Sequence, residues 1–449
     1  MRPSLKYFIP ILCVAVMGCT DDSAEPSVPS ATEDRDTQFN RWAYGQMNHH
    51  YLWRTDMPDS LACEYSLAPA EFFKSLLSKR DRFSYLTGND SFTGSSELLR
   101  QDYGFEFQLF EDLVGNVAAQ VLYITSQRVA DAGICRGDFL EVRGNHFTGR
   151  RVAPDAGGTF AYVDTPLQGI PEIGDETPST IQYYSIIDTG TKRIGYVCYL
   201  QFESSLDIVS VLCYFSVNHI DELVLDLRYN PGGYVSTCRE LGNWILPANA
   251  YGGIYQHCEY NDIITAERTA AYGEDFCNSY YEYPTGTPLE YVDAKPLQLP
   301  RMFVLTSTHT ASASEAAIVC MRPYMEVVQI GETTVGKGVG SYNLRDKRFP
   351  LALQPITMQY YNALGETTPD SGLVPDIVIE GTYDTSRSHI GELTEPLLHA
   401  ALTAIDPVTF PPLPDEGARS RTAKISPIGE PSFVVKFRLK NVFSHDITR

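Results

Sequence analysis

A serine and a lysine that lie 25 residues apart are the side chains best suited to chemistry in this sequence. Ser312 stands in the run Thr-Ala-Ser-Ala-Ser-Glu at 310–315, and Lys337 stands in the glycine-rich run 331–338. Serine is a weak nucleophile until a neighbouring base takes its proton. A lysine among apolar neighbours has its charged form disfavoured, so it can be neutral enough to act as that base. The two stretches together predict a nucleophile and base pair.

Each stretch alone also has a structural interpretation. Ser-x-x-Glu, from Ser312 to Glu315, is a capping box when it precedes an apolar helix. Residues 336–338, Gly-Lys-Gly, are typical of a surface turn. Residues 331–337 have the Gly-x-x-x-x-Gly-Lys spacing of a P-loop, but Gly338 replaces the serine or threonine that would hold magnesium. No pattern marks any of the nine histidines as the base, and the offset of His309 from the serine fits no catalytic triad.

The elements around the pair are predicted from periodicity. From about residue 178 onward strands alternate with helices, which indicates an α/β layer. Ser312 lies where a buried strand passes into a helix, so helix amide groups converge on its hydroxyl. Residues 251–300 are rich in tyrosine and are predicted to be an irregular insertion over the site. The predicted strands are 194–200, 222–228, 302–306, 327–330 and 351–362, and the predicted helices are 234–246, 313–321 and 389–405.

The N-terminus is predicted to be a targeting signal. Residues 1–18 carry two early positive charges and an apolar stretch too short to span a bilayer, as in a signal peptide. The segment ends at Cys19 in a pattern that resembles a bacterial lipobox, with ordinary secretion as the alternative. Residues 19–36 are predicted to be a flexible tether. We therefore expect a lipid anchor on Cys19 and a location in the cell envelope, as an outer-membrane lipoprotein facing the periplasm or the cell surface.

Two further units precede the α/β layer. Residues 37–95 predict a helical cap with helices at 37–55 and 69–78, in which the sequence shows no chemistry. Residues 96–165 resemble a PDZ domain through their Ala-Gly-x-x-x-Gly-Asp-x-x-x-x-Val-x-Gly spacing. Such domains take an extended peptide as an added strand. The resemblance implies peptide binding by Tyr103, Gly104, Phe105 and Phe107, and a small β-barrel with only a structural role is the alternative.

Composition limits the remaining function classes. The net charge of −21 argues against nucleic acid, which needs a basic binding surface. No Cys-x-x-Cys and no tight Cys/His cluster occurs, so we expect no metal site and no cofactor. Cys258 and Cys277 flank a polar segment and are candidates for a disulfide. Cys198, Cys213 and Cys320 stand in apolar runs and are predicted to be buried thiols.

Four ordered stretches carry a family resemblance. They are 226–233 (Asp-Leu-Arg-Tyr-Asn-Pro-Gly-Gly), 312–315 (Ser-Ala-Ser-Glu), 331–338 (Gly-Glu-Thr-Thr-Val-Gly-Lys-Gly) and 372–377 (Gly-Leu-Val-Pro-Asp-Ile). In order, residue type and spacing they resemble the tail-specific, or C-terminal processing, serine proteases with a PDZ domain, in a bacterial lipoprotein form. The resemblance implies an α/β fold: a crotonase/ClpP-like protease core, here 178–385, preceded by the PDZ-like domain and the cap. Residues 386–449 remain as a C-terminal helix and tail, in which Phe433 to Leu439 alternates like a strand.

The resemblance also implies residue roles. Ser312 matches the nucleophile and Lys337 the general base. The amide of Ala313, with one from Gly232 or Gly233, matches the oxyanion hole. The implied partners are polypeptide substrates.

Two positions depart from the family pattern. Thr310 replaces the first serine of the usual Ser-Ala-Ser-Ala-Ser run. Ser341 stands four residues after the lysine, where many members have a Gln or Glu that orients it. Ser341 could hydrogen-bond Lys337 but carries no charge. The sequence therefore predicts an envelope serine endopeptidase that cleaves C-terminal tails of exported or unfolded proteins. The alternative is a non-catalytic peptide-binding lipoprotein on the same fold, and an acyl-transfer enzyme would leave the Ser/Lys pair unexplained.

Overall fold

The computed structural model describes residues 33–88, 97–163, 169–171, 179–379, 388–413 and 425–440. The predicted signal peptide, Cys19 and nearly all of the tether lie outside these ranges. Among the described residues, no helix combines the length and apolar character needed to cross a bilayer.

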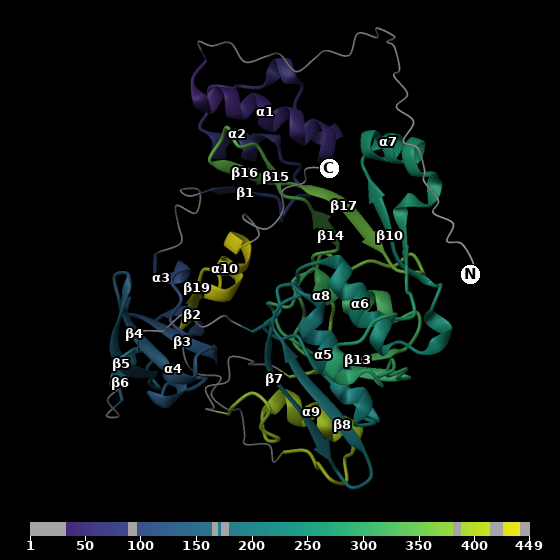
Figure 1. The fold of residues 1–449 in the computed structure, drawn as a ribbon. Coiled ribbons are helices and arrows are strands. Elements are labelled where there is room, and N and C mark those ends of the chain that lie inside the picture. Colours follow the sequence, from purple (N-terminus) through teal and green to yellow (C-terminus); the bar gives the residue numbers. More distant parts are fainter. Residues whose placement is uncertain are drawn as a thin grey trace, which may run out of the picture.

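A six-stranded sheet lies in the lower part of the molecule as viewed in Figure 1. Its order is β18-β13-β12-β9-β8-β7, and every neighbouring pair is parallel except β7 with β8. Register aligns three strand ends, because Leu305 pairs with Asp226 and Thr306 pairs with Gly331. The loops that follow β9, β12 and β13 carry the predicted chemistry, and they therefore leave the sheet at the same end, where these three parallel strands have their carboxyl ends. The strands are β7 Ile181–Asp188, β8 Arg193–Tyr199, β9 Glu222–Asp226, β12 Arg301–Thr306, β13 Glu326–Gly331 and β18 Ile377–Val378.

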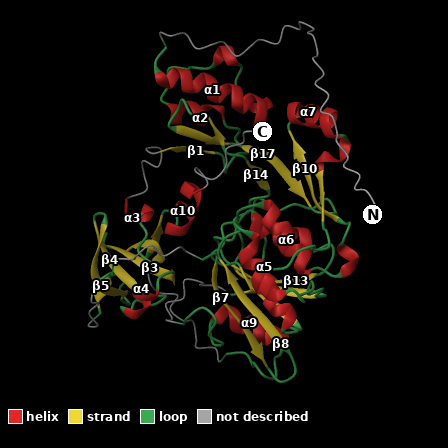
Figure 2. Cartoon of the chain, viewed as in Figure 1, coloured by secondary structure: helices red, strands yellow, loops and turns green. Residues whose placement is uncertain are grey.

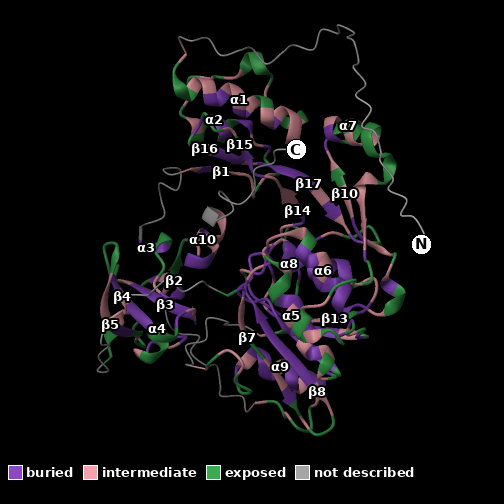
Figure 3. Cartoon of the chain, in the orientation of Figure 1, coloured by how far each residue is buried: buried purple, intermediate pink, exposed green. Residues whose placement is uncertain are grey.

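Helices cover both faces of this sheet (Figure 2). One face packs on α5 Ser205–Val217, α6 Val235–Ile245 and α8 Ala313–Met321, and the other packs on α9 Pro396–Ile405. In β9, Leu223 and Leu225 face the first core and Val224 faces the second. Burial on both faces explains why the strands are continuous apolar runs in the sequence. The predicted α/β layer is confirmed, and Figure 3 shows its strands buried.

The segment 251–300 is more regular than predicted. It contains β10 Ile254–Tyr260, α7 Asp262–Tyr272 and β11 Asn278–Tyr280, with short 3-10 turns at Glu274–Cys277 and Leu289–Tyr291. A further 3-10 turn, Ala248–Ala250, directly precedes the segment. Its strands join β17 Ile356–Tyr361 and β14 Val339–Ser341 in a sheet of order β11-β10-β17-β14. The irregular prediction was wrong because these polar and tyrosine-rich strands lack a simple apolar alternation. The predicted strand 351–362 is divided at Pro355 into β16 Leu351–Gln354 and β17.

The N-terminal cap is joined to the core by a strand. Its helices are α1 Arg35–His50 and α2 Pro69–Leu76, with 3-10 turns at Arg54–Asp56 and Ser60–Ala62. The first helix ends before the predicted residue 55, and Pro69 occupies the first turn of α2 as expected. Strand β1 Tyr85–Gly88 pairs with β16, which also pairs with β15 Leu344–Arg345. The cap therefore completes a sheet with residues that follow the lysine loop.

The small β domain is a sheet of order β19-β2-β3-β4-β5-β6. The tail enters it: β19 pairs with β2, and α10 Ser432–Lys440 packs beside it. The predicted strand at 433–439 was therefore wrong, and the segment is a helix. The other elements are α3 Glu97–Arg100, β2 Phe105–Glu111, β3 Val117–Ile124, α4 Gln127–Asp131, β4 Phe139–Arg143, β5 His146–Pro154, β6 Phe160–Tyr162 and β19 Ser426–Ile428.

A buried arginine docks this domain on the core. Arg136, in a predicted turn, donates to the Tyr229 hydroxyl at 3.2 Å and lies 3.7 Å from the Glu395 carboxylate. Glu395 also binds Arg228 through two oxygens, at 2.5 and 2.8 Å. Arg136 and Glu395 are buried, so each charge has its partner out of water. The small domain is thereby fixed against the strand end from which the Asn-Pro-Gly-Gly turn departs.

Candidate active site

Ser312 has a strained backbone and an accessible side chain. Its φ is +58° and its ψ is −116°, a combination that residues with a Cβ rarely adopt. Every other residue from Ala311 to Met321 is buried, whereas Ser312 is partly exposed. Backbone strain of this kind persists only where the surroundings impose it, and it concentrates at functional sites. The fold therefore presents this one hydroxyl at the start of α8.

Buried hydrogen bonds hold the serine segment to the turn after β9. The Thr310 hydroxyl donates to the Leu227 carbonyl at 2.9 Å, and the Ser314 hydroxyl donates to the Asn230 carbonyl at 2.9 Å. The amide of Ala311 donates to the same Asn230 carbonyl at 3.3 Å. Thr310 is fully buried, and its hydroxyl holds the serine segment in place through this hydrogen bond. The replacement of the usual serine by threonine therefore keeps the hydroxyl that the segment uses. The two loops form one rigid unit.

The turn itself requires glycine. The Asn230 side chain fixes it by donating to the Tyr199 carbonyl and by accepting from the Gly232 amide, both at 2.9 Å. Gly232 has φ +108°, and a Cβ there would lie 2.8 Å from the Ser312 Cβ. A Cβ at Gly233, where φ is +144°, would lie 2.2 Å from the Phe202 carbonyl oxygen. Backbone and nucleophile thus approach at a distance that only glycine allows.

Two amides beside the serine are suited to bind an oxyanion. Within the described residues, the amides of Ala313 and Gly233 donate to no acceptor, and Gly233 lines the same cavity as Ser312. The third predicted donor differs, because the Gly232 amide is already bound to Asn230. The Ala313 amide with that of Gly233 is the better pair for a developing negative charge.

Glu315 joins the serine and lysine segments. Its carboxylate accepts from the amides of Ser312 and Lys337, each at 2.8 Å, and from the Gly336 amide at 2.7 Å. The Thr334 hydroxyl donates to it at 2.5 Å. The predicted capping contact is therefore present, and it belongs to a larger tether. Burial raises the pKa of Glu315, against the opposing effect of these donors.

Lys337 lies in a packed turn. Gly336 and Gly338, on its two sides, are buried, and a Cβ at Gly336 would lie 2.3 Å from the Asp370 carbonyl oxygen. The surface-turn interpretation is thereby wrong. The lysine ammonium lies 5.7 Å from the centre of the Phe83 ring, in the cap. Burial, with the charge of Arg438 adding to it, lowers the pKa of Lys337 to about 8.

Ser312 and Lys337 face one cavity of about 430 Å³. Tyr85 from the cap and Phe437 from α10 complete its wall. Ser341 also lines it, and its hydroxyl accepts a hydrogen bond from Gln354 Nε2 at 3.0 Å. The segment 251–300 contributes to the cavity wall, as predicted, through residues of β10, β11 and the 3-10 turn before β11, namely Gln256, Cys258, Tyr260, Phe276, Cys277, Asn278 and Ser279.

Comparisons with known proteins identify the family of this chain. Residues 193–379 match the family model described as peptidase family S41, and residues 38–85 match the model described as the peptidase S41 N-terminal domain. The chain belongs to peptidase family S41. The resemblance to the C-terminal processing protease family is confirmed, whereas the PDZ domain and the lipoprotein form stay predictions. The residues matched by the first model include both catalytic candidates, Ser312 and Lys337.

Individual relatives of this S41 chain are distant. Carboxyl-terminal-processing peptidase 1, chloroplastic, of Arabidopsis thaliana is 25% identical over 298 residues, covering 62% of this chain and 56% of the relative. The alignment thus spans little more than half of that protein. A crystal structure of a putative S41 protease from Bacteroides fragilis has a TM-score of 0.66 at 23% identity and covers 84% of this chain and 98% of that chain. This second likeness shows the fold.

The structure also bears on His309 as an alternative base and on the predicted states of the cysteines. Burial lowers the pKa of His309 to about 4, and its ring packs edge-on against Phe433. Cys258 and Cys277 are free thiols, so the disulfide considered for them is not formed. Cys198, Cys213 and Cys320 are buried, as predicted.

The predicted peptide-binding residues of this S41 chain lie on the small β domain. Gly104 has φ +74°, and its carbonyl accepts from the amides of Thr125 and Ser126, which closes the loop before β2. Phe105 and Phe107 are fully buried in the domain core, and the Tyr103 ring packs on Phe107 and Phe147. The loop and strand are as predicted, but the outer edge of β2 is already paired with the tail.

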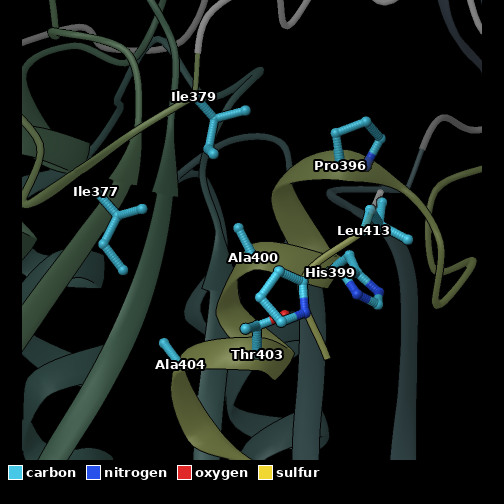
Figure 4. A pocket seen from close by; sticks show the side chains of 9 residues that line it. Ile377, Ile379, Pro396, His399, Ala400, Thr403, Ala404 and Leu413 are labelled. Carbon is cyan, nitrogen blue, oxygen red and sulfur yellow. The ribbon is translucent and has the colours of Figure 1, made fainter. Parts of the chain in front are cut away.

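Sequence reasoning missed three residues of the S41 site. Tyr85 and Phe83 come from the cap, where no chemistry was expected, and Gln354 comes from β16. Their sequence signals are weak, because each approaches the cavity only through strand pairing or tertiary contact. A second cavity of about 390 Å³ lies beside α9, with an apolar wall that includes Ile377, Ile379 and Ala400 (Figure 4). It contains neither Ser312 nor Lys337, so it is separate from the candidate active site.

Proposed function

We propose that this chain is a serine endopeptidase that uses Ser312 as nucleophile and Lys337 as general base. The single observation that carries the proposal is the strained, accessible Ser312, which shares a cavity with a lysine of lowered pKa. Membership of a peptidase family supports the reaction class. A neutral lysine is required for the role, and the low pKa makes the neutral form available near neutral pH.

The reaction has two proton-balanced halves. Lys337 takes the proton from the Ser312 hydroxyl as its oxygen attacks the peptide carbonyl, and the amides of Ala313 and Gly233 bind the resulting oxyanion. The carbon–nitrogen bond then breaks, and Lys337 returns the proton to the leaving amine. In the second half, water attacks the acyl-enzyme while Lys337 accepts its proton. That proton returns to the serine oxygen as the acid product leaves.

Cleavage of a fluorogenic peptide by the wild type, Ser312→Ala and Lys337→Ala tests the proposal. We expect turnover to fall by at least about 10³-fold in both variants, because nucleophile and base act as a unit. Ser210→Ala on α5 and the exposed Lys347→Ala are matched controls remote from the cavity. Equal turnover in all five proteins would refute the mechanism.

A non-catalytic binding function is the second candidate, and one observation favours it. The place of the usual orienting Gln or Glu holds Ser341, whose hydroxyl accepts from Gln354. If peptides bind but are not cleaved, and a fluorophosphonate does not label Ser312, the protein binds rather than cleaves. Labelling of Ser312 without turnover would instead indicate a latent protease, because only an activated serine reacts with the probe.

We further propose that the substrates are exported or unfolded polypeptides with accessible C-terminal tails, held in extended form along the small β domain. A lipid on Cys19 would keep the enzyme in the cell envelope, in the outer membrane. Mass spectrometry of the N-terminal peptide and membrane fractionation of Cys19→Ser test the anchor. An unmodified Cys19 and an unchanged distribution would exclude it.

A further inference from the structure

The tail of this chain occupies the position in which a peptide would bind. Strand β19 lies along the outer edge of β2, and α10 continues toward the catalytic cavity between the small β domain and the core (Figure 1). The two elements are linked by only three residues, so they act as one segment, 425–440, which we call the docked tail.

The strand part of the docked tail pairs weakly. Ser426, Pro427 and Ile428 pair with only the last three residues of β2, 109–111. Pro427 has no amide hydrogen and cannot donate to the ladder. The Gln108 side chain adds a bond to the Ile428 carbonyl at 3.0 Å. An extended peptide without proline would form a longer ladder on the same edge.

The helical part meets an acidic site on the first half of β2. The Ser432 hydroxyl accepts from the Phe107 amide at 2.9 Å and donates to the Glu106 carboxylate. The Lys436 ammonium lies 2.8 Å from Glu106 and 3.8 Å from Asp102. Glu106 is buried, so it requires a cation or a donor as its partner. A peptide carboxylate at this place would be repelled.

Apolar contacts fix the position of the helix from both sides. Val435 is buried in the core of the small β domain with Phe105 and Phe107. Phe433 is buried on the opposite side, with its ring 6.0 Å from Tyr229. The docked tail therefore presents an apolar residue followed directly by a lysine to the small domain.

The docked tail ends at the chemistry. Phe437 lines the catalytic cavity and also a neighbouring cavity of about 270 Å³, whose wall includes Glu106, Pro231 and Lys436. The helix thus separates the acidic site from Ser312. Arg438, one residue further, has its charge close enough to lower the pKa of Lys337.

From these contacts we propose that the β2 edge with Glu106 and Asp102 is a binding site for a polypeptide segment that pairs with the end of β2 and then presents, from a helical turn, an apolar residue followed by Lys or Arg. The docked tail is its resident ligand and competes with substrate. This inference rests on the proposed peptidase function for its consequence, though its binding step is independent of cleavage. In this proposal the small β domain recognises an apolar residue followed by a basic residue, and not the C-terminal carboxylate of a peptide.

Binding is tested on full-length chains that carry Ser312→Ala, so that nothing is cut. The probe is a fluorescein-labelled peptide with the sequence of residues 425–440. We expect Lys436→Glu to release the docked tail, so that the probe binds at least about tenfold more tightly than to the chain with the native tail, which competes at millimolar effective concentration. Adding Glu106→Gln should remove the probe's binding again, and a probe with glutamate at the Lys436 position should bind neither chain. Lys347→Glu is the matched charge-reversal control and should resemble the native tail.

Cleavage forms the second arm, in chains with Ser312 intact. Lys436→Glu should raise kcat/KM for a fluorogenic peptide containing Val-Lys by about fivefold or more, with little change in kcat. A charge swap, Glu106→Lys with Lys436→Glu, should restore the low value and shows that the fold survives. Failure of the probe to bind the Lys436→Glu chain, or unchanged kcat/KM in an active enzyme, would overturn the proposal. Probe binding with no cleavage in any chain would instead refute the peptidase function alone.

Discussion

The serine segment and the lysine segment reach the same cavity by different means. Residues 307–315 are held by buried hydrogen bonds to the turn after β9, and Ser312 is strained into position. The backbone of Lys337 is held by the close packing of the glycines beside it and by the hydrogen bond from its amide to Glu315. Its side chain is partly buried, near the Phe83 ring and the charge of Arg438. Ser312 is thus positioned by backbone geometry, whereas the neutral form of Lys337 is made available by its electrostatic surroundings. Perturbing each segment should therefore give a different kinetic signature.

Gly232→Ala should have the largest effect, because it acts on geometry. The added Cβ would lie 2.8 Å from the Ser312 Cβ and 2.9 Å from the Ala311 carbonyl oxygen, at φ +108°. We expect kcat to fall by about 10²–10³-fold, as for the loss of an oxyanion donor. Gly252→Ala shares a positive φ but has open space around its Cβ, so it controls for backbone strain alone. A similar fall in kcat in both variants would mean that backbone strain at a positive φ, and not displacement of Ser312, causes the loss.

The sequence predicted the parts of this site that depend on local patterns and missed the parts that depend on contacts between distant segments. The motifs located Ser312, Lys337 and the glycine turn, because strand ends and helix starts leave local patterns. The tether through Glu315 was read only as a helix cap, since its contacts with Gly336 and Lys337 cross 21 and 22 residues. Such a contact depends on the register of β12 and β13 and has no local signal.

The docked tail was mispredicted for a related reason. Alternation over 433–439 indicated a strand with one buried face. The segment is a helix buried on two sides, with Phe433 in the core beneath α9 and Val435 in the small β domain. A helix held between two bodies shows apolar residues on both faces, so its periodicity is lost. Burial there is set by tertiary contacts that the local pattern does not contain.

Glu315→Gln should have the next largest effect, because it loosens the joint between the segments. The amide cannot accept at all four donors, and each buried donor left without a partner costs about 1–3 kcal/mol. We expect kcat to fall by about 10²-fold, since a shift of about 1 Å at a reacting group has that consequence. Asp112→Asn is the matched control: this buried carboxylate also accepts from several amides, but in the small β domain. If it lowers kcat as much as Glu315→Gln at equal loss of stability, the tether is not specific to catalysis.

The pH dependence should report the base. With a pKa of about 8, the neutral fraction of Lys337 rises about tenfold per pH unit below pH 8 and then levels. We expect kcat/KM to follow that curve. A base at His309, whose pKa is about 4, would instead give a flat profile above pH 6 and would contradict this assignment.

The same group makes a prediction about stability. Because the pKa of Lys337 falls from 10.5 to about 8 on folding, the unfolded chain binds the extra proton between these values. The contribution of this group to stability therefore increases from pH 8 to 10.5 and is smallest below pH 8. The difference in the free energy of unfolding between the wild type and Lys337→Met should change in that window and remain constant below it. A constant difference across the whole range would show that burial does not affect this lysine.

Ser341 and Gln354 should show the smallest effect, and they test how Lys337 is oriented. Gln354 Nε2 donates to the Ser341 hydroxyl at 3.0 Å, and both side chains line the cavity with Lys337. If the pair replaces the usual orienting residue, Gln354→Ala and Ser341→Ala should each lower kcat by about fivefold, the equivalent of one neutral hydrogen bond of about 1 kcal/mol. The double variant should lose no more than either single variant, because both changes remove one unit. Additive losses would assign the two residues separate roles, and the lysine would then be oriented by its burial alone.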